Sequence, residues 1–104
     1  MAQGERAPSN ILTLDIEDWR QSAPDVYYPS QASSRSLVAP SDRVIANTHR
    51  LLDILDRLGV RATCFVLGSV AEAFPALVRE IDGRGHEVAV HGYGHRPVYV
   101  MSPE

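Results

Sequence analysis

Short apolar runs in this sequence alternate with longer segments in which apolar residues recur every three or four positions. The runs at 10–15, 60–67 and 88–90 are rich in branched residues, which is typical of buried strands. The segments 41–58 and 70–81 carry apolar stripes at helical spacing. The order strand, helix, strand, helix, strand predicts an α/β fold whose parallel strands are joined by right-handed helical crossovers.

The segment 41–58 carries the clearest helical pattern. Ser41 suits the N-cap position, and Asp42 suits the positive end of the helix dipole. Gly59 is the expected C-cap residue because glycine readily adopts the left-handed conformation there. The predicted apolar stripe consists of Val44, Ile45, Thr48, Leu51, Leu52, Leu55 and Leu58.

The second helical segment is interrupted by Pro75. A proline inside a helix removes a backbone donor, so we expect either a kink or a new helix with Pro75 at its first position. Gly83 and Gly85 are expected to end this helix. The strand before it, at 60–67, is apolar enough to predict that both of its faces are covered.

Two stretches lack any helical or strand periodicity. Residues 1–9 are expected to be a disordered lead-in, and 21–40 is a long segment rich in Ser, Pro and Ala. Loops of this length inside a compact domain are usually functional or disordered. Aromatic side chains in this part of the chain either offer flat faces to a sugar ring or pack the loop onto the body: Trp19, Tyr27 and Tyr28.

The composition is that of one small globular domain. The 104 residues are 44% hydrophobic and 22% charged, with a net charge of −3 that gives no reason to expect nucleic acid or an anionic membrane as a partner. The single cysteine, Cys64, is expected to be a buried small hydrophobe. Neither a signal peptide nor an apolar stretch of about 20 residues is seen, so the expected location is cytoplasmic, with no membrane span.

Three carboxylates follow the first predicted strand within four positions. Asp15, Glu17 and Asp18 would be costly to desolvate together without a counter-charge. A bound cation or a shared proton is the usual remedy. In the alternative interpretation, Glu17 and Asp18 are solvated loop residues and Asp15 caps a turn or helix.

A pair of histidines follows the third predicted strand. His91 and His95 have the i, i+4 spacing that lets two imidazoles hold one metal ion, although Gly92 and Gly94 favour a loop rather than a regular helix. The alternative is two surface histidines in a flexible loop. In a parallel sheet the carboxylates and the histidines both lie at strand C-terminal ends, where α/β folds build their sites. This convergence favours a metal site.

The sequence also resembles a known family. The runs 61–68, 74–81 and 85–96 look like those of the NodB-type polysaccharide deacetylases, carbohydrate esterase family 4. The start at 12–19 is most similar to the branch associated with exosortase and exopolysaccharide gene clusters. The resemblance covers nearly everything from residue 11 to residue 104.

This resemblance implies a divalent metal, most often zinc, held by one acidic residue and two histidines. His91 and His95 match the family's histidine motif. The acidic motif, Asp-Ile-Glu-Asp-Trp, departs from the common pattern of two adjacent aspartates followed by glycine. Asp15 best matches the catalytic base. Asp18 is the expected metal carboxylate, and Glu17, which shares a strand face with Asp15, remains the alternative.

The implied activity is metal-dependent hydrolytic N-deacetylation of an N-acetylated polysaccharide or oligosaccharide, in exopolysaccharide biosynthesis. Trp19 and Tyr93 are the candidate substrate-binding residues. The general acid is expected from a later family motif. Two alternatives stay open. One is a cyclic-amide hydrolase of the same fold, as for allantoin, and the other is a non-catalytic saccharide-binding fragment.

The family fold is an irregular (β/α) barrel, of which this sequence supplies a βαβαβ portion. Residues 10–104 are therefore expected to be the N-terminal part of a truncated NodB homology domain. Three strands with two helices would leave an edge and an apolar face open. We expect this portion to self-associate, or to need a missing C-terminal half that completes the barrel.

Overall fold

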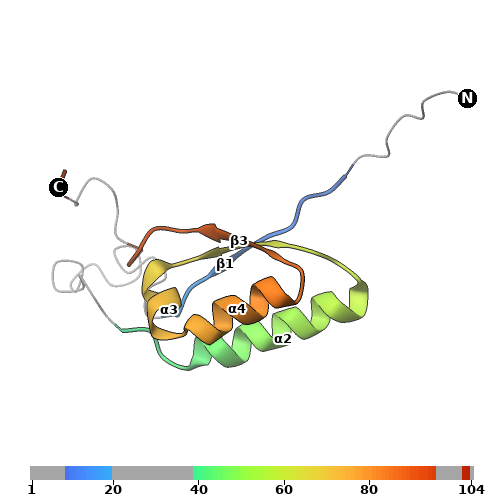
Figure 1. Cartoon of the computed structure of the whole chain (residues 1–104), viewed down its shortest axis with the longest axis horizontal. Helices are drawn as coiled ribbons and strands as arrows, with labels where there is room; N and C mark the ends of the chain where they lie inside the picture. Colours follow the sequence, from blue (N-terminus) through green and yellow to red (C-terminus); the bar gives the residue numbers. More distant parts are fainter. Residues whose placement is uncertain (1–8, 20–38, 96–101, 104) are drawn as a thin grey trace, which may run out of the picture.

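The computed structural model describes residues 9–19, 39–95 and 102–103. Within them the chain forms a parallel three-stranded sheet, in the order β1-β2-β3, with its helices in the crossovers (Figure 1). The predicted α/β order and the parallel strands are confirmed. The elements are β1 (Thr13–Ile16), α2 (Arg43–Leu58), β2 (Thr63–Val66), α3 (Gly68–Ala73), α4 (Pro75–Gly83) and β3 (Glu87–Val90).

The helices lie together on one side of the sheet, and the core fills the space between these two layers (Figure 1). Side chains from β1 and β2 meet side chains from all three helices there. The buried cluster consists of Ile16, Val44, Leu52, Cys64, Val66, Leu67, Val70, Leu77 and Ile81. The opposite face of the sheet has no helix over it in the described part of the chain.

The one-sided helix layer corrects the expectation for the second strand. In β2, Cys64 and Val66 are buried, but the alternate residues Thr63 and Phe65 are only half-buried. For the described part of the chain the prediction of two covered faces was wrong, because alternate side chains of a strand point to opposite faces and helices there meet only one of them. Cys64 is buried as expected, and desolvation raises the pKa of its thiol.

The start of α2 differs from the sequence prediction. The helix begins at Arg43 with Asp42 as its N-cap residue, so the expectation of Ser41 as the N-cap was wrong. The hydroxyl of Ser41 instead donates a hydrogen bond to a carboxylate oxygen of Asp18, 2.7 Å away. A buried carboxylate needs such a donor. The Asp18 carboxylate therefore competes with the N-terminus of α2 for the Ser41 hydroxyl.

The ends of the helices follow the predicted signals more closely. Gly59 is the C-cap of α2 with φ 63°, a conformation that glycine adopts without steric cost. Pro75 opens a new helix, α4, rather than kinking a longer one. The apolar stripe of α2 is only partly buried, since Leu51 and Leu58 are exposed.

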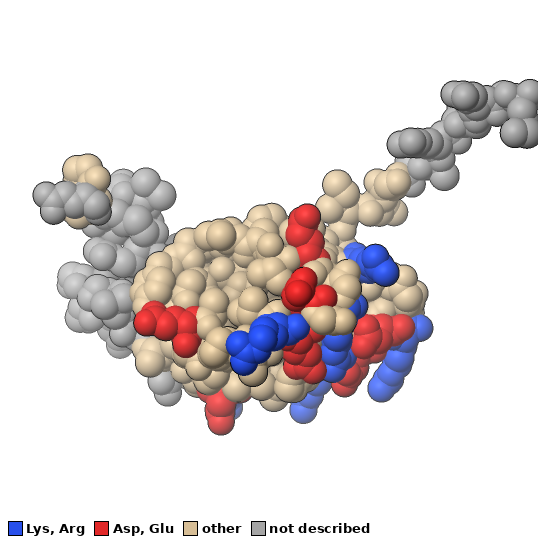
Figure 2. All heavy atoms as spheres, in the orientation of Figure 1, with Lys and Arg blue, Asp and Glu red and all other residues tan. Residues whose placement is uncertain are grey.

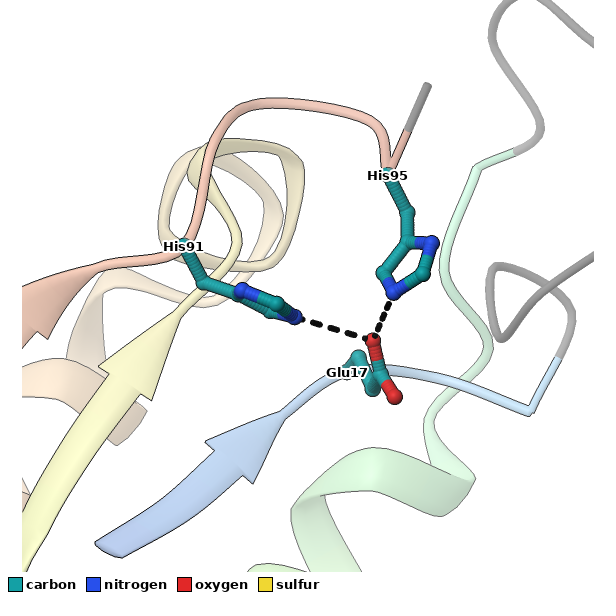
Figure 3. Close-up of side chains that lie close together, drawn as sticks. All are labelled: Glu17, His91 and His95. Carbon is teal, nitrogen blue, oxygen red and sulfur yellow. Dashed lines mark hydrogen bonds and ion pairs between the residues drawn. The ribbon is translucent and has the colours of Figure 1, made fainter. Parts of the chain in front are cut away.

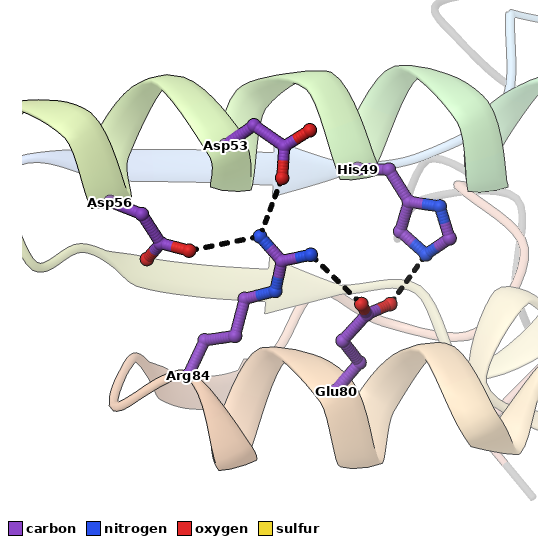
Figure 4. A network of polar contacts seen from close by, with 5 residues as sticks. All are labelled: His49, Asp53, Asp56, Glu80 and Arg84. Carbon is purple, nitrogen blue, oxygen red and sulfur yellow. Dashed lines mark hydrogen bonds and ion pairs between the residues drawn. The ribbon is translucent and has the colours of Figure 1, made fainter.

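A network of charged side chains joins α2 to the end of α4 (Figure 4). Arg84 donates to Asp53 at 2.8 Å, to Asp56 at 3.0 Å and to Glu80 at 3.0 Å. His49 of α2 pairs with the second oxygen of Glu80. The hydrogen bond from Arg84 lowers the pKa of Asp53. Partial desolvation opposes the shift at Glu80, but hydrogen bonds from Arg84 and His49 lower its pKa overall.

The surface shows where the sheet is uncovered. Acidic and basic side chains are interspersed over the helical layer, and the surface along β3 is largely without charge (Figure 2). On that edge strand Val88 is exposed and Val90 is 81% exposed, although both share the helix-facing side of the sheet with Cys64 and Val66, so the helical layer leaves β3 largely uncovered. No helix in the described ranges is long and apolar enough to cross a membrane. The predicted lead-in at 1–9 and the loop with Tyr27 and Tyr28 fall almost entirely outside the described residues.

Candidate metal centre

The register of the sheet brings the carboxylates and the histidines to one edge. Ile16 pairs with Val66, and Val66 pairs with Val90, so the next residues, Glu17 and His91, continue the same row. The backbone pairing also continues, because the His91 N–H donates to the Val66 carbonyl at 3.2 Å. Counting by twos along each strand, both side chains belong to the face opposite the helices. Two segments more than seventy residues apart thus meet at the strand C-terminal ends.

Glu17, His91 and His95 converge at this edge (Figure 3). The Nε2 atom of His95 lies 2.9 Å from Oε2 of Glu17, and Nε2 of His91 lies 3.3 Å from the same oxygen. The two imidazole rings meet edge to face with centroids 5.2 Å apart. The side chain of Glu17 is 19% exposed, so the cluster is partly shielded but open to solvent.

The second histidine reaches the cluster through a tight loop. Gly92 has φ 70° and His95 has φ 60°, both in the left-handed region. That conformation costs a non-glycine residue on the order of 1 kcal/mol. The loop therefore turns back toward β1 only where surrounding contacts hold it, and His95 sits at the position that carries the backbone strain.

The donor set of this cluster suits zinc. One carboxylate oxygen and two imidazole nitrogens lie within 4.8 Å of one another. Two ligands of a tetrahedral zinc, each about 2.0–2.1 Å from the ion, are about 3.3 Å apart. The spacings of 2.9 and 3.3 Å between Glu17 and the histidines are close to that value. Held by three such ligands, a zinc ion would keep a fourth position for water or substrate, as in catalytic zinc sites.

Asp15 lies beside this cluster without joining it. Its Oδ2 atom is 3.7 Å from Nε2 of His91, and its side chain is 56% exposed. Asp15 precedes Glu17 by two residues and therefore belongs to the same face. A carboxylate in this position is near enough to exchange a proton with a molecule bound at the cluster and is open to solvent.

Asp18, the carboxylate expected to bind the metal, lies elsewhere. It is 1% exposed and accepts the hydrogen bond from Ser41 at the start of α2. Among the described residues, the group with metal-ligand spacing contains Glu17 and the two histidines but not Asp18. The alternation of the strand, which puts Glu17 on the face of Asp15, was the sequence signal that pointed to this arrangement.

The two candidate substrate-binding residues differ in their surroundings. Trp19 is about half exposed, directly after the carboxylates. Tyr93 lies between the two histidines, and its hydroxyl donates a hydrogen bond to Glu72 on α3. That hydrogen bond raises the pKa of Tyr93, because it favours the protonated phenol. Sequence reasoning missed this pair, since two side chains 21 residues apart leave no periodic signal.

His86 lies outside the cluster of Glu17, His91 and His95. It is buried just before β3, and its Nδ1 atom accepts a hydrogen bond from the Ala62 N–H at 3.1 Å. An acceptor Nδ1 requires the neutral ring with its proton on Nε2. No partner for Nε2 is found among the described residues. His86 therefore links β3 to the residue before β2 rather than serving the edge where His91 lies.

A family model described as polysaccharide deacetylase matches residues 40–104. The chain belongs to the polysaccharide deacetylase family. The matched span contains both histidines of the cluster, His91 and His95, whereas Asp15 and Glu17 lie before it. The choice among the carboxylates therefore depends on the geometry of the site.

Individual deacetylases and a deacetylase-like protein match about half of the chain. A peptidoglycan-N-acetylglucosamine deacetylase of Bacillus cereus is 44% identical over 48 residues, which is 46% of this chain and 18% of the relative. A peptidoglycan deacetylase-like protein of Gibberella zeae is 40% identical over 57 residues, 53% of this chain and 17% of the relative. A chitooligosaccharide deacetylase of Sinorhizobium fredii is 44% identical over 48 residues, 46% of this chain and 22% of the relative. The matched segments thus span about a fifth of the length of these curated relatives.

Proposed function

We propose that this protein catalyses metal-dependent hydrolytic N-deacetylation of an N-acetylated polysaccharide or oligosaccharide. The observation that carries the proposal is the convergence of Glu17, His91 and His95 beside Asp15. Membership of the polysaccharide deacetylase family supports the reaction class. The relatives named for peptidoglycan and chitooligosaccharide deacetylation support an N-acetylated sugar as the substrate.

The proposed zinc ligands are Glu17, His91 and His95. Glu17 replaces the initially favoured Asp18, because Asp18 is buried against Ser41 whereas Glu17 contacts both imidazoles. To bind the ion, each imidazole must be neutral, with the lone pair of Nε2 free and its proton on Nδ1. When bound, zinc would supply a Lewis acid that polarises the acetamide carbonyl and lowers the pKa of water.

The proposed general base is Asp15. Hydrolysis adds one water across the amide: the water oxygen bonds to the carbonyl carbon, the carbon–nitrogen bond breaks, and acetate and an amine leave. Asp15 accepts a proton from the attacking water, which its exposed carboxylate on the face of Glu17 is suited to do. The leaving nitrogen must gain a proton. We propose that a histidine from a later motif of the family supplies this proton.

The open face of the sheet suggests how the site is enclosed. Helices cover one face, and the strand alternation assigns Asp15, Glu17 and His91 to the other. A (β/α) barrel has this arrangement, with helices outside and functional residues at the C-terminal ends of inner strands. We therefore propose that the three strands are a portion of an irregular (β/α) barrel, and that the saccharide binds at this rim.

The test compares two aspartates in the native protein by measuring acetate release from N-acetylated oligosaccharides. Asp15→Asn should lower turnover by about 10²-fold or more while zinc binding persists. Asp53→Asn, in the Arg84 network of the helical layer, is the matched control and should keep its turnover. Removing zinc with a chelator should abolish activity, and adding zinc back should restore it.

Three outcomes would contradict the proposal. Full turnover without metal, especially on cyclic amides such as allantoin, would favour a cyclic-amide hydrolase. Saccharide binding that depends on Trp19 but yields no acetate would favour a non-catalytic binding module. Equal losses for Asp15→Asn and Asp53→Asn would remove the role assigned to Asp15.

We further propose a role in exopolysaccharide biosynthesis, which the sequence at 12–19 supports. Deleting the gene should raise the acetyl content of the extracellular polysaccharide relative to the parent strain. Restoring the wild-type gene should reverse the change, whereas restoring the Asp15→Asn variant should not. An unchanged acetyl content would contradict this role without affecting the proposed chemistry.

A further inference from the structure

The middle of the loop that carries the histidines rests on helix α3, whereas its first residue, His91, is hydrogen-bonded to β2. The Gly68 N–H donates to the Gly92 carbonyl at 2.8 Å, and the Ser69 N–H donates to the Tyr93 carbonyl at 3.0 Å. The Tyr93 hydroxyl donates to the carboxylate of Glu72, one turn further along α3. Backbone contacts to the first turn of the helix and a side-chain contact to its second turn thus hold the middle of the loop.

The contact is too close for a side chain at Gly68. A Cβ atom built there would lie 2.7 Å from Cδ2 of Tyr93 and 3.3 Å from its Cα. Both distances are shorter than ordinary van der Waals contact. The loop can therefore take its present position only if residue 68 has no side chain. The requirement comes from the approach of Tyr93, because Gly68 does not have a positive φ.

The same loop needs support for a second reason. It holds His95 in the left-handed region, a conformation that persists only where neighbouring contacts determine it. Its two ends are the histidines whose Nε2 atoms meet Glu17 (Figure 3). A shift of the loop by a fraction of an ångström would therefore change the spacing of the imidazole nitrogens.

We propose that Gly68, Glu72 and Tyr93 form a clamp that positions the 91–95 loop so that its histidines hold metal-ligand spacing. The three are positioning residues: they act through the loop and do not touch the metal. This inference rests on the proposed zinc site. It also gives Tyr93, initially a candidate for substrate binding, a role in holding the loop.

The first experiment removes the side-chain hydrogen bond and measures zinc affinity of the full chain by competition with a chromophoric chelator. Tyr93→Phe and Glu72→Ala should each weaken zinc binding by about 10-fold, the scale seen for groups that orient metal ligands. The double variant should lose no more than either single variant, because both remove one interaction. Glu72→Gln keeps an acceptor for the hydroxyl and should restore most of the affinity.

A matched control is the exposed hydrogen bond from Thr63 to Glu87 at 2.9 Å. It also joins a hydroxyl to a glutamate, but at the start of β3 rather than beyond its end. Glu87→Ala should leave zinc affinity unchanged. An equal loss in Glu87→Ala and Glu72→Ala would mean general loosening of the fold and would overturn the clamp, as would wild-type affinity in Tyr93→Phe.

The second experiment uses two helical glycines. Gly68→Ala should displace the loop and weaken zinc binding by about 10-fold or more. Gly83→Ala, the last residue of α4, is the control, because a Cβ there meets nothing within 4 Å. Alanine favours both helices, so thermal melting of the two variants shows whether any lost affinity comes from unfolding. Unchanged affinity in a folded Gly68→Ala protein would contradict the close packing.

A readout without metal separates the clamp from the zinc site. Heteronuclear NOE values of residues 92–94 in the metal-free chain should fall in Tyr93→Phe and stay high in Glu87→Ala. If the wild-type chain binds no zinc, the proposed metal site fails, and this loss of order alone decides whether the clamp exists. If zinc binds and the NOE values of Tyr93→Phe match those of the wild type, the clamp fails and the metal site stands.

Discussion

Two clusters in this protein are built alike, each around a glutamate that contacts two basic side chains. In the helical layer Glu80 accepts from Arg84 and pairs with His49 (Figure 4). At the edge of the sheet Glu17 contacts His91 and His95 (Figure 3). The difference is the chemistry of the partners. A guanidinium is always charged and has no lone pair to offer, whereas a neutral imidazole can bind a metal.

The surroundings of the two clusters also differ, in a way that fits the chemistry of their partners. The Arg84 cluster joins α2 to the end of α4, so its hydrogen bonds link two helices that already pack on one core. The Glu17 cluster lies on the sheet face opposite the described helices, at a loop with Gly92 and His95 in the left-handed region. One carboxylate is neutralised within the fold, and the other leaves its histidines able to take up a cation. We therefore interpret the Arg84 cluster as a structural link between helices and propose the Glu17 cluster as the metal site.

The largest expected effect concerns the core under the helical layer. Leu52 of α2 is fully buried, whereas Leu58 on the same helix is 68% exposed. Leu52→Ala should lower the free energy of unfolding by about 2–5 kcal/mol, because it leaves a cavity. Leu58→Ala should change it by less than about 1 kcal/mol. Urea titrations followed by circular dichroism measure both, and equal effects would mean that the helices do not cover the core as described.

The next effect compares the two glutamates directly. Glu17→Gln should weaken zinc binding by about 100-fold or more, since losing a ligand exceeds the loss of groups that only orient ligands. Glu80→Gln should leave zinc affinity unchanged. Isothermal titration with zinc measures both variants, with Asp18→Asn as a third. A loss confined to Asp18→Asn would return the ligand role to the carboxylate first expected from the sequence.

A smaller effect concerns the buried carboxylate of Asp18 beside the start of α2. Ser41→Ala removes a donor from the 1%-exposed Asp18 and should lower the free energy of unfolding by about 1–3 kcal/mol. Thr63→Val removes an equally direct hydrogen bond to the exposed Glu87 and should cost less than about 1 kcal/mol. Denaturant midpoints measure the difference. Equal costs would mean that the Asp18 carboxylate finds another donor or water.

Sequence patterns predicted what depends on neighbours along the chain. The order of the elements follows from periods of two and 3.6. The interruption at Pro75, as a kink or a new helix, and the helix end at Gly59 follow from the backbone of those two residues. His91 was expected at the end of a strand, and the structure has it directly after β3. Each of these features is written within a few consecutive residues.

Features that depend on distant partners were not predictable in the same way. The hydroxyl of Ser41 has two uses, and the choice depends on Asp18, 23 residues away. The sequence of an apolar strand such as β2 is the same whether one of its faces or both are covered, because composition does not reveal where helices pack. The preference between Glu17 and Asp18 likewise needed the register of β1 against β2 and β3.

The smallest expected effect tests the structural cluster by its dependence on pH. Arg84 lowers the pKa of Asp53 and Glu80 in the folded state. Such carboxylates stabilise the fold above their unfolded pKa values, about 4, and this contribution disappears as the pH falls through the lower folded values. Arg84→Gln should therefore lower the melting temperature at pH 7, by less than Ser41→Ala does, and the gap to wild type should close toward pH 3.

Arg79→Gln is the control for this experiment, because it removes the same charge from an exposed position on α4. Its melting temperature should track that of the wild type at every pH. A gap for Arg84→Gln that stayed constant from pH 7 to pH 3 would mean that its aliphatic stem, rather than its ion pairs, stabilises the helices. That result would not affect the Glu17 cluster, because its contacts with His91 and His95 do not involve Arg84.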